Sequence, residues 1–421
     1  MIPRPASWRS RPATVLVVLF MAACLPEAPS GGQTPTAAPA AGTAAPSEDL
    51  TPVAGPTAAE GQTPQPGDRP VSVLACGDIL LSRTPGKRAE QYGYRYLFEG
   101  MRELVSSADV AFANLETPAS WLGQPYPGKP ENVTFRADPA TLFGLSWAGF
   151  DVLSLANNHI NDYGPRALSE TLEYLDLLGL GRVGAGRDLA EARRPVIVER
   201  DGVRLAFLAY AEPAWSVVEA RGAMEARVLT RVETRLHGAP PPPASPRDPD
   251  DARSSMVGVA PAVIADMVAD VRRALATLDP DYLFVSVHWG DEHQNLPRAF
   301  QKAFGRAAVD AGATAVFGHH PHVLQSVERY GDGLIAYSLG NFVFDMKADA
   351  TYLTAALRLN LAGGALRSAE IIPVRIVRGS YAPEPAGPAD AMTILNGIRR
   401  WSRALGTELS IESGRGFIRF P

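Results

Sequence analysis

The sequence predicts an α/β fold for the part of the chain beyond about residue 70. Short apolar runs with the composition of buried strands alternate there with segments in which apolar residues recur at helical spacing. Several of the runs end directly in histidines, carboxylates or amides. Because alternating strands and helices pack in layers around buried sheets, we expect these polar side chains to project into one shared cleft.

The predicted elements follow a regular order. The strand-like runs are 71–75, 110–113, 152–156, 205–210, 282–287 and 315–317. Helical spacing occurs at 139–147, 165–178, 261–278 and 298–311. Three later runs follow one another without a helix between them, at 334–339, 352–361 and 369–377. We expect these three to form a second, more antiparallel sheet.

Residues 1–24 have the features of a lipoprotein signal. Arginines precede an apolar stretch at 13–23, which is too short to cross a bilayer but has the length of a secretory signal. Small residues stand just before Cys24, as in a bacterial lipobox, in which this cysteine is lipidated after cleavage. The alternative is an ordinary signal peptide with a chance cysteine. We expect an extracytoplasmic protein anchored to the cell membrane as a lipoprotein.

Other segments depart from the α/β pattern. Residues 25–70 are dominated by Pro, Ala, Thr, Gly and Ser, which bury too little apolar surface to offset their ordering entropy, so a disordered tether is predicted. An Arg- and Pro-rich stretch at about 216–256 indicates an exposed insertion, either a solvated loop or a lid. The domain proper is expected at 71–380, and residues 381–421 as a C-terminal extension packing on it.

Composition limits the possible functions. The formal net charge is -5, and the basic residues are mostly arginines scattered along the chain. Because no basic stripe with interleaved aromatic residues is present, nucleic-acid binding is not expected. The chain has 2 cysteines, so lipidation of Cys24 leaves Cys76 without an intramolecular partner. Cys76 lies within an apolar run and is interpreted as a buried small hydrophobe.

Six of the 7 histidines fall in three short segments, each of which follows a strand-like run: 156–162, 288–293 and 318–322. A single histidine is usually structural, but the last segment supplies three imidazoles in four positions. Asp78 follows the first run, and Asn114 and Glu116 follow the second and point to the same side in strand geometry. Imidazoles and carboxylates gathered at strand ends predict a metal site.

These blocks carry a resemblance to a known family. The sequence is similar, in the same order, to CapA-type poly-γ-glutamate capsule synthesis proteins at 77–78, 114–116, 154–162, 288–290, 318–325 and 335–345. The resemblance spans roughly residues 71–380. It implies the four-layer αββα sandwich of calcineurin-like metallophosphoesterases, with two sheets between helices. It also implies a role in making, exporting or anchoring an anionic γ-glutamyl polymer at the cell surface, with capsule synthesis membrane proteins as further partners.

The resemblance also implies roles for individual residues. It implies one or two divalent ions, Mn, Zn or Fe, bound by Asp78, Glu116, Asn158, His288, His320 and His322. His159 resembles the histidine that protonates a leaving group or stabilises a transition state. Either His319 or His320 can pair with His322; alternate spacing favours His320. The usual first-motif histidine is replaced by Leu80, which weighs against a full dinuclear centre.

Two classes of function remain open at this point. As an enzyme, the protein would be a metal-dependent hydrolase or transferase acting on a γ-glutamyl or phosphate-containing substrate, with His159 as general acid. As a non-catalytic module, it would hold the carboxylates of the polymer through the metal and through arginines. Turnover distinguishes the two classes.

We expect the Cys24→Ser variant to be released into the soluble fraction or to remain as the uncleaved precursor. Two acyl chains on Cys24 would hold the protein firmly on a membrane, whereas serine has no thiol to which the lipid can be attached. Membrane fractionation with fatty-acid labelling measures this. Lipid labelling that is unchanged by the substitution would exclude Cys24 as the anchor.

Overall fold

The computed structural model describes residues 69–212 and 258–421. The expected signal with Cys24, the insertion at 216–256 and all but the last two residues of the expected tether lie outside the described residues. Within the described ranges, no helix combines the length and the apolarity that a membrane crossing requires.

The larger sheet has ten strands and joins both ends of the domain. Its order is β17-β18-β15-β14-β1-β2-β3-β4, with β13 paired to β1 and β16 paired to β15. Strands β1 to β4 are mutually parallel, whereas β14 lies antiparallel to β1 and to β15. The strands are β1 (Val71–Ile79), β2 (Val110–Leu115), β3 (Val152–Ser154), β4 (Gly181–Val183), β13 (Asn341–Val343), β14 (Leu353–Ala362), β15 (Ala365–Ile376), β16 (Pro383–Pro385), β17 (Ser410–Glu412) and β18 (Arg415–Arg419).

The second sheet has six strands in the order β11-β12-β10-β9-β7-β6. Its central strands are parallel, and its two edge strands run antiparallel to their neighbours. The strands are β6 (Val196–Arg200), β7 (Val203–Ala211), β9 (Tyr282–His288), β10 (Ala315–His319), β11 (Val327–Tyr330) and β12 (Gly333–Ala336). A separate two-stranded sheet pairs β5 (Ala185–Gly186) with β8 (Gly258–Val259).

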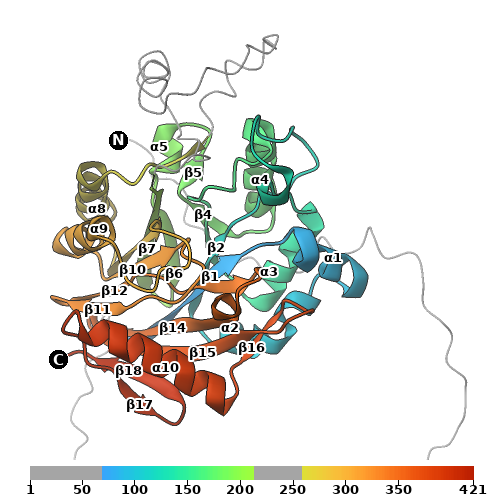
Figure 1. The fold of residues 1–421 in the computed structure, drawn as a ribbon. Helices are drawn as coiled ribbons and strands as arrows, with labels where there is room; N and C mark the ends of the chain where they lie inside the picture. The colour runs from blue at the N-terminus through green and yellow to red at the C-terminus, as the bar shows by residue number, and fades with distance from the viewer. Residues whose placement is uncertain (1–68, 213–257) are drawn as a thin grey trace, which may run out of the picture. The chain divides into compact units, whose positions relative to one another are not determined.

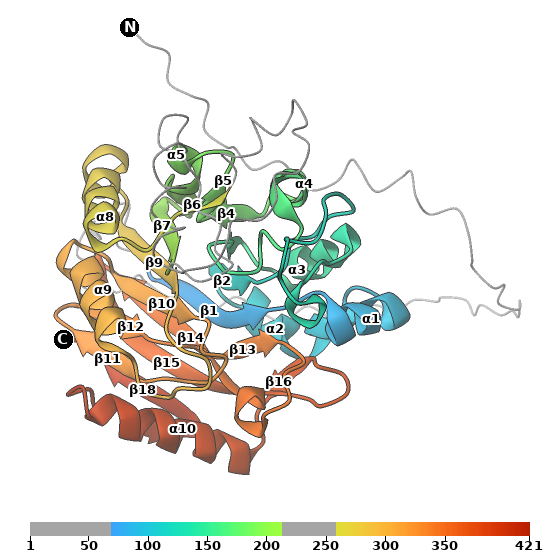
Figure 2. The same cartoon turned by 45° about the horizontal axis from the view of Figure 1, so that its top comes forward.

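Helices cover the outer faces of the two large sheets. α8 and α9 lie over the six-stranded sheet, whereas α10 lies along β14, β15 and β18 of the larger sheet (Figures 1 and 2). The helices are α1 (Arg83–Tyr92), α2 (Arg102–Ser106), α3 (Leu142–Ala148), α4 (Gly164–Leu177), α5 (Leu189–Ala192), α8 (Ile264–Leu278), α9 (Ala299–Asp310) and α10 (Pro388–Arg403), with short 3-10 turns at Tyr96–Met101, Glu131–Val133, Pro139–Thr141 and Asp349–Tyr352.

The six-stranded sheet is buried on both faces, which explains its continuous apolar runs. In β7, Leu205 and Phe207 point into the core shared with the larger sheet, whereas Leu208 and Tyr210 point toward α8 and α9. Because successive side chains along a strand point to opposite faces of the sheet, β7 contributes residues to two hydrophobic cores. Such a strand shows no alternation of polar and apolar residues in the sequence.

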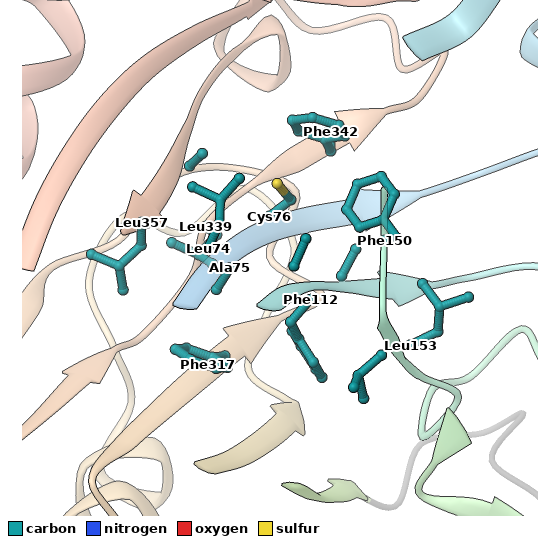
Figure 3. Packing of buried hydrophobic residues seen from close by; sticks show 14 of the residues in the cluster. Leu74, Ala75, Cys76, Phe112, Phe150, Leu153, Phe317, Leu339, Phe342 and Leu357 are labelled. Atoms are coloured by element: carbon teal, nitrogen blue, oxygen red, sulfur yellow. The ribbon is translucent and has the colours of Figure 1, made fainter. Parts of the chain in front are cut away.

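Aromatic side chains fill the space between the two sheets. Phe112 of β2 stacks on Phe207 at a ring-centroid distance of 5.7 Å and lies 5.4 Å from Phe317 of β10. Figure 3 shows Phe112 and Phe317 facing each other from their strands, with Cys76 of β1 in the same cluster. Cys76 is fully buried, and burial raises the pKa of its thiol. The expectation that it packs as a small hydrophobe is confirmed.

The mixed α/β class with more than one sheet is confirmed, but the predicted grouping of the last strands is wrong. The run at 334–339 contributes β12 to the six-stranded sheet, whereas the runs at 352–361 and 369–377 become β14 and β15 of the larger sheet. Local patterns identify strands but carry no information on their distant partners. β14 pairs with β1, which lies almost three hundred residues earlier in the chain.

We expect Phe112→Ala to lower the free energy of unfolding by about 3–5 kcal/mol, because it leaves a cavity between the two sheets. Phe143→Ala is the matched control, since Phe143 is 59% exposed and Phe112 is fully buried; its effect should stay within about 0.5 kcal/mol. Urea unfolding followed by circular dichroism measures both. Equal losses in the two variants would contradict the packing described here.

Candidate metal centre

The register of the parallel strands brings the polar residues of the two sheets to one place. In the larger sheet, Asp78 of β1 lies opposite Asn114 of β2 and Asn341 of β13. In the six-stranded sheet, His288 ends β9 opposite His319 of β10. The carboxyl ends of parallel strands are the usual place for sites in α/β proteins. The expected convergence of the strand-end residues is therefore present.

Two glycines allow the backbone to come close at these strand ends. A Cβ atom on Gly77 would lie 2.0 Å from the carbonyl oxygen of Gly340, and one on Gly318 would lie 2.0 Å from that of Tyr337. The φ of Gly77 is not in the left-handed region, so the close approach of the neighbouring backbone, and not a turn, is the reason that only glycine fits there.

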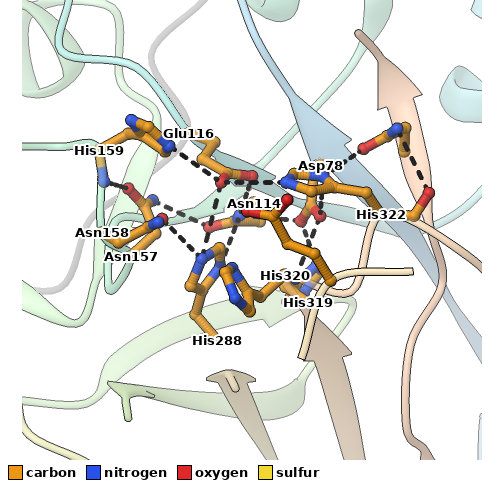
Figure 4. Close-up of polar contacts among 12 residues, drawn as sticks. Asp78, Asn114, Glu116, Asn157, Asn158, His159, His288, His319, His320 and His322 are labelled. Carbon is orange, nitrogen blue, oxygen red and sulfur yellow. Dashed lines mark hydrogen bonds and ion pairs between the residues drawn. The ribbon is translucent and has the colours of Figure 1, made fainter. Parts of the chain in front are cut away.

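Two groups of three residues have the geometry to hold a metal ion, and they share one carboxylate. The groups are Glu116, His288 and His320, and Asp78, Glu116 and His322; within each group the potential ligand atoms lie within 4.8 Å of one another. Glu116 Oε1 is 3.6 Å from His288 Nε2 and 4.0 Å from His322 Nε2. Figure 4 shows these side chains turned toward one another around Glu116.

The donor atoms fit a divalent cation. Glu116 Oε1, His319 Nε2 and His320 Nδ1 are buried and form no hydrogen bond within the described residues, although a buried polar atom without a partner is costly. A cation would satisfy such atoms directly. Carboxylate and imidazole ligands together suit Mn, Zn or Fe. Because Glu116 belongs to both groups, the residues could hold one ion or two neighbouring ions.

Burial sets the charges of the site before any ion binds. Burial and the neighbouring charge of Asp78 raise the pKa of Glu116 well above its usual value. Burial also lowers the pKa of His288, and lowers that of His320 to about 3, with further repulsion between the histidines. Both imidazoles are therefore neutral near pH 7, which is the form that binds a metal. For Asp78, burial favours a higher pKa, but the hydrogen bond and charge of His319 and the charge of His322 outweigh it and lower that pKa.

Asparagine side chains hold the candidate ligands in place. Asn114 Nδ2 donates to Asp78 Oδ1 at 2.9 Å, and its own Oδ1 accepts from Asn157 Nδ2 at 3.1 Å. Asn158 Oδ1 lies 2.8 Å from His288 Nε2, so both atoms face the same space. Asn341 Oδ1 lies 2.7 Å from His322 Nδ1, which leaves His322 Nε2 toward Glu116. Such partners orient metal-binding imidazoles.

His159 lies beside the two groups and belongs to neither. Its Nδ1 is 2.8 Å from Asp162 Oδ2, its ring stacks on Phe135 at 4.1 Å, and its Nε2 is 4.0 Å from Glu116 Oε1. Lys129 contacts Asp162 and lies 3.2 Å from His159 Nδ1. Burial lowers the pKa of His159 to about 4 despite Asp162, so the ring is neutral near pH 7.

His319 and His293, the two remaining histidines of the three segments, occupy different places. His319 is fully buried, and its Nδ1 lies 3.0 Å from Asp78 Oδ1, whereas the two groups contain His320 and His322. His293 has a side chain that is 45% exposed, with Glu292 as its charged neighbour. It belongs to neither group and is partly exposed to solvent.

Sequence reasoning missed Lys129 and the role of Asn341. Lys129 lies in a loop between predicted elements, where nothing in the local pattern marks a buried lysine, although only 4% of its side chain is exposed. Asn341 lies within the block 335–345 that carries the family resemblance. That block could have drawn attention to it, but its contact with His322 depends on the folded arrangement.

Comparisons with known proteins agree with the family resemblance. Residues 72–346 match the family described as bacterial capsule synthesis protein PGA_cap. The capsule biosynthesis protein CapA of Bacillus anthracis is 30% identical over 314 residues, covering 74% of this chain and 69% of the relative. The PGA biosynthesis protein CapA of Bacillus subtilis is 28% identical, covering 83% and 82%. A probable polyglutamine synthesis accessory protein of Mycobacterium tuberculosis is 29% identical, covering 80% and 92%.

We expect the purified protein to bind Mn or Zn, and His288→Ala to lose at least one equivalent of it. Because binding free energy stabilises the folded form, the variant should also gain less melting temperature on addition of the metal. His293→Ala, outside both groups, should behave like the wild type. Elemental analysis and thermal denaturation measure both effects. A wild type without metal and without a thermal shift would rule out the centre.

Proposed function

The chain belongs to the PGA_cap family of bacterial capsule synthesis proteins, and we propose that it acts on an anionic capsule polymer such as poly-γ-glutamate through a metal-dependent hydrolase or transferase site. The names of its relatives support a role in capsule polymer synthesis. The observation that carries the catalytic part is Glu116, whose unpartnered buried oxygen is shared by both metal-binding groups and lies beside His159.

The proposed ligands are Asp78, Glu116, Asn158, His288, His320 and His322. A bound divalent cation would polarise a phosphoryl or amide carbonyl oxygen and lower the pKa of water. Asn114 and Asn341 keep Asp78 and His322 in position. His319 supports Asp78 through its Nδ1 and is not proposed as a ligand, because neither group of three contains it.

His159 is proposed to move the proton. With Nδ1 held by Asp162, its Nε2 points toward Glu116 and is the atom that can face a reacting group. Because the ring is neutral near pH 7, Nε2 first accepts a proton from the attacking group and then returns it to the leaving group. The stacked Phe135 and the ion pair of Lys129 with Asp162 fix the orientation of the ring.

One observation favours the non-catalytic alternative, a metal-containing module that only binds the polymer. Leu80, which replaces the usual first-motif histidine, is fully buried and packs with Phe135 and Phe344. An apolar side chain there supplies no ligand to the centre. A site that has one imidazole fewer than the usual metallophosphoesterase centre can bind a carboxylate of the polymer without cleaving the polymer.

The place of action is proposed to be the outer side of the cell membrane. A lipid on Cys24, followed by the tether at 25–70, would hold the domain near the membrane where a capsule polymer is exported. Membrane proteins of capsule synthesis are the partners that such a position suggests. Cys24 and all but the last two residues of the tether lie outside the described ranges, so the proposal rests on the sequence pattern.

We expect His159→Gln to lower turnover by roughly two to four orders of magnitude, the range typical of a lost proton-transfer group, while metal content stays near that of the wild type. The assay uses metal-supplemented protein on γ-linked oligoglutamate and on a generic phosphodiester. His293→Gln is the matched control and should retain full turnover.

The same experiment separates the two functions. If metal-loaded wild-type protein turns over neither substrate but retains the oligomer, the result would favour the non-catalytic binding module over the enzyme. In that case His159→Gln should change the affinity for the oligomer only modestly. Loss of metal in His159→Gln would instead make this residue a ligand.

A further inference from the structure

A second site candidate lies at the C-terminal part of the chain, apart from the metal-binding groups. A cavity of about 1320 Å³ opens between the end of α10, the hairpin of β17 and β18, and the residues around the turn from β11 to β12. None of its lining residues belongs to the metal groups. We call it the arginine groove, after five of its lining residues: Arg329, Arg399, Arg400, Arg403 and Arg419.

The groove is positive although the whole chain carries a net charge of -5. Its five arginines face two acidic lining residues, Glu408 and Glu412. Glu412 already pairs with Arg419 at 3.4 Å. A concave surface on which one sign of charge prevails concentrates ions of the opposite sign. The groove therefore favours an anionic ligand.

Four of the five arginines form no ion pair with any carboxylate in the ranges 69–212 and 258–421; only Arg419 does, with Glu412. Arg399 contacts Asn396 Oδ1 at 2.7 Å, and Arg400 lies over the ring of Trp401. Cations near a helix C-terminus gain a little from the helix dipole, but like charges at i and i+4, such as Arg399 and Arg403, repel. Helix stability alone does not explain this group of arginines, because Arg329 lies in β11 and Arg419 lies in β18.

Hydrogen bonds fix the walls of the groove relative to one another. The backbone N–H of Arg329 donates to Thr407 Oγ1 at 2.8 Å, and that of Val327 donates to Ser402 Oγ at 2.8 Å, so β11 is tied to the end of α10. The Arg329 side chain donates to the carbonyl oxygen of Arg419 at 3.3 Å and lies over the Phe420 ring. A rigid frame reduces the entropy lost when a ligand binds.

We propose that the arginine groove binds a stretch of the anionic polymer through the polymer's carboxylates, as a holding site separate from the metal centre. The inference rests on the proposed function, from which it takes the chemistry of the polymer. Guanidinium groups bind carboxylates in pairs of hydrogen bonds. The volume exceeds the roughly 300–1,000 Å³ of small-molecule pockets, which suits a chain segment. A flat anionic membrane cannot enter a concave groove in the same way.

The test compares three full-length proteins for binding of fluorescently labelled γ-linked oligoglutamate. They are the wild type, the groove variant R399Q/R400Q/R403Q, and the control variant K87Q/R194Q/R272Q, which removes the same charge from exposed side chains elsewhere. The groove variant should weaken binding by at least about tenfold, with a shallower salt dependence. The control should change it by less than about twofold. Metal content should be equal in all three.

A charge-preserving variant, R399K/R400K/R403K, tests the paired hydrogen bonds between guanidinium and carboxylate groups. It also keeps the inference testable if the glutamine variant does not fold. It should bind with intermediate affinity, because lysine keeps the charge and loses the paired hydrogen bonds. Equal binding by groove and control variants would overturn the inference and leave the proposed function intact. No binding by the wild type would overturn both. Preference of the groove for anionic lipid vesicles over the oligomer would also overturn it.

Discussion

The candidate centre depends on the parallel register that ends two different sheets at the same place. Asp78 lies opposite Asn114 and Asn341 in one sheet, and His288 lies opposite His319 in the other. The packing of Phe112 against Phe207 and Phe317 keeps those strand ends facing each other. Because side chains alternate along a strand, a shift of one residue in either sheet would turn the candidate ligands away from each other.

Burying the polar groups of the candidate centre costs folding free energy. Two carboxylates and several imidazoles are buried together; burial and the charge of Asp78 shift the pKa of Glu116 upward, and burial and the neighbouring histidines shift that of His288 downward. A buried oxygen without a hydrogen bond, as on Glu116, is expensive in any state that lacks a cation. Natural proteins tolerate such groups where they serve a function. The electrostatics of the site and its proposed chemistry therefore have the same origin.

The C-terminal segment is part of the architecture of the domain. Residues 381–421 supply β16, β17 and β18 to the larger sheet, and α10 packs through Ile394, Leu395 and Ile398 into its core. The buried face of α10 holds the helix on the sheet, which leaves its arginines on the exposed side. The same helix thus completes a hydrophobic layer and builds one wall of the arginine groove.

The sequence by itself predicted the central strands of both sheets and the helices α3, α4, α8 and α9, although not α10 or β18, and it identified the strand-end residues from which both candidate metal-binding groups are drawn. These features are local, since periodicity and residue type follow directly from neighbours in the chain. Only the tertiary structure decided which sheet received β12, β14 and β15, that Glu116 is shared by the two groups, and that Lys129 and Asn341 join the site. These depend on contacts between residues far apart in the chain, for which a single sequence contains no local signal.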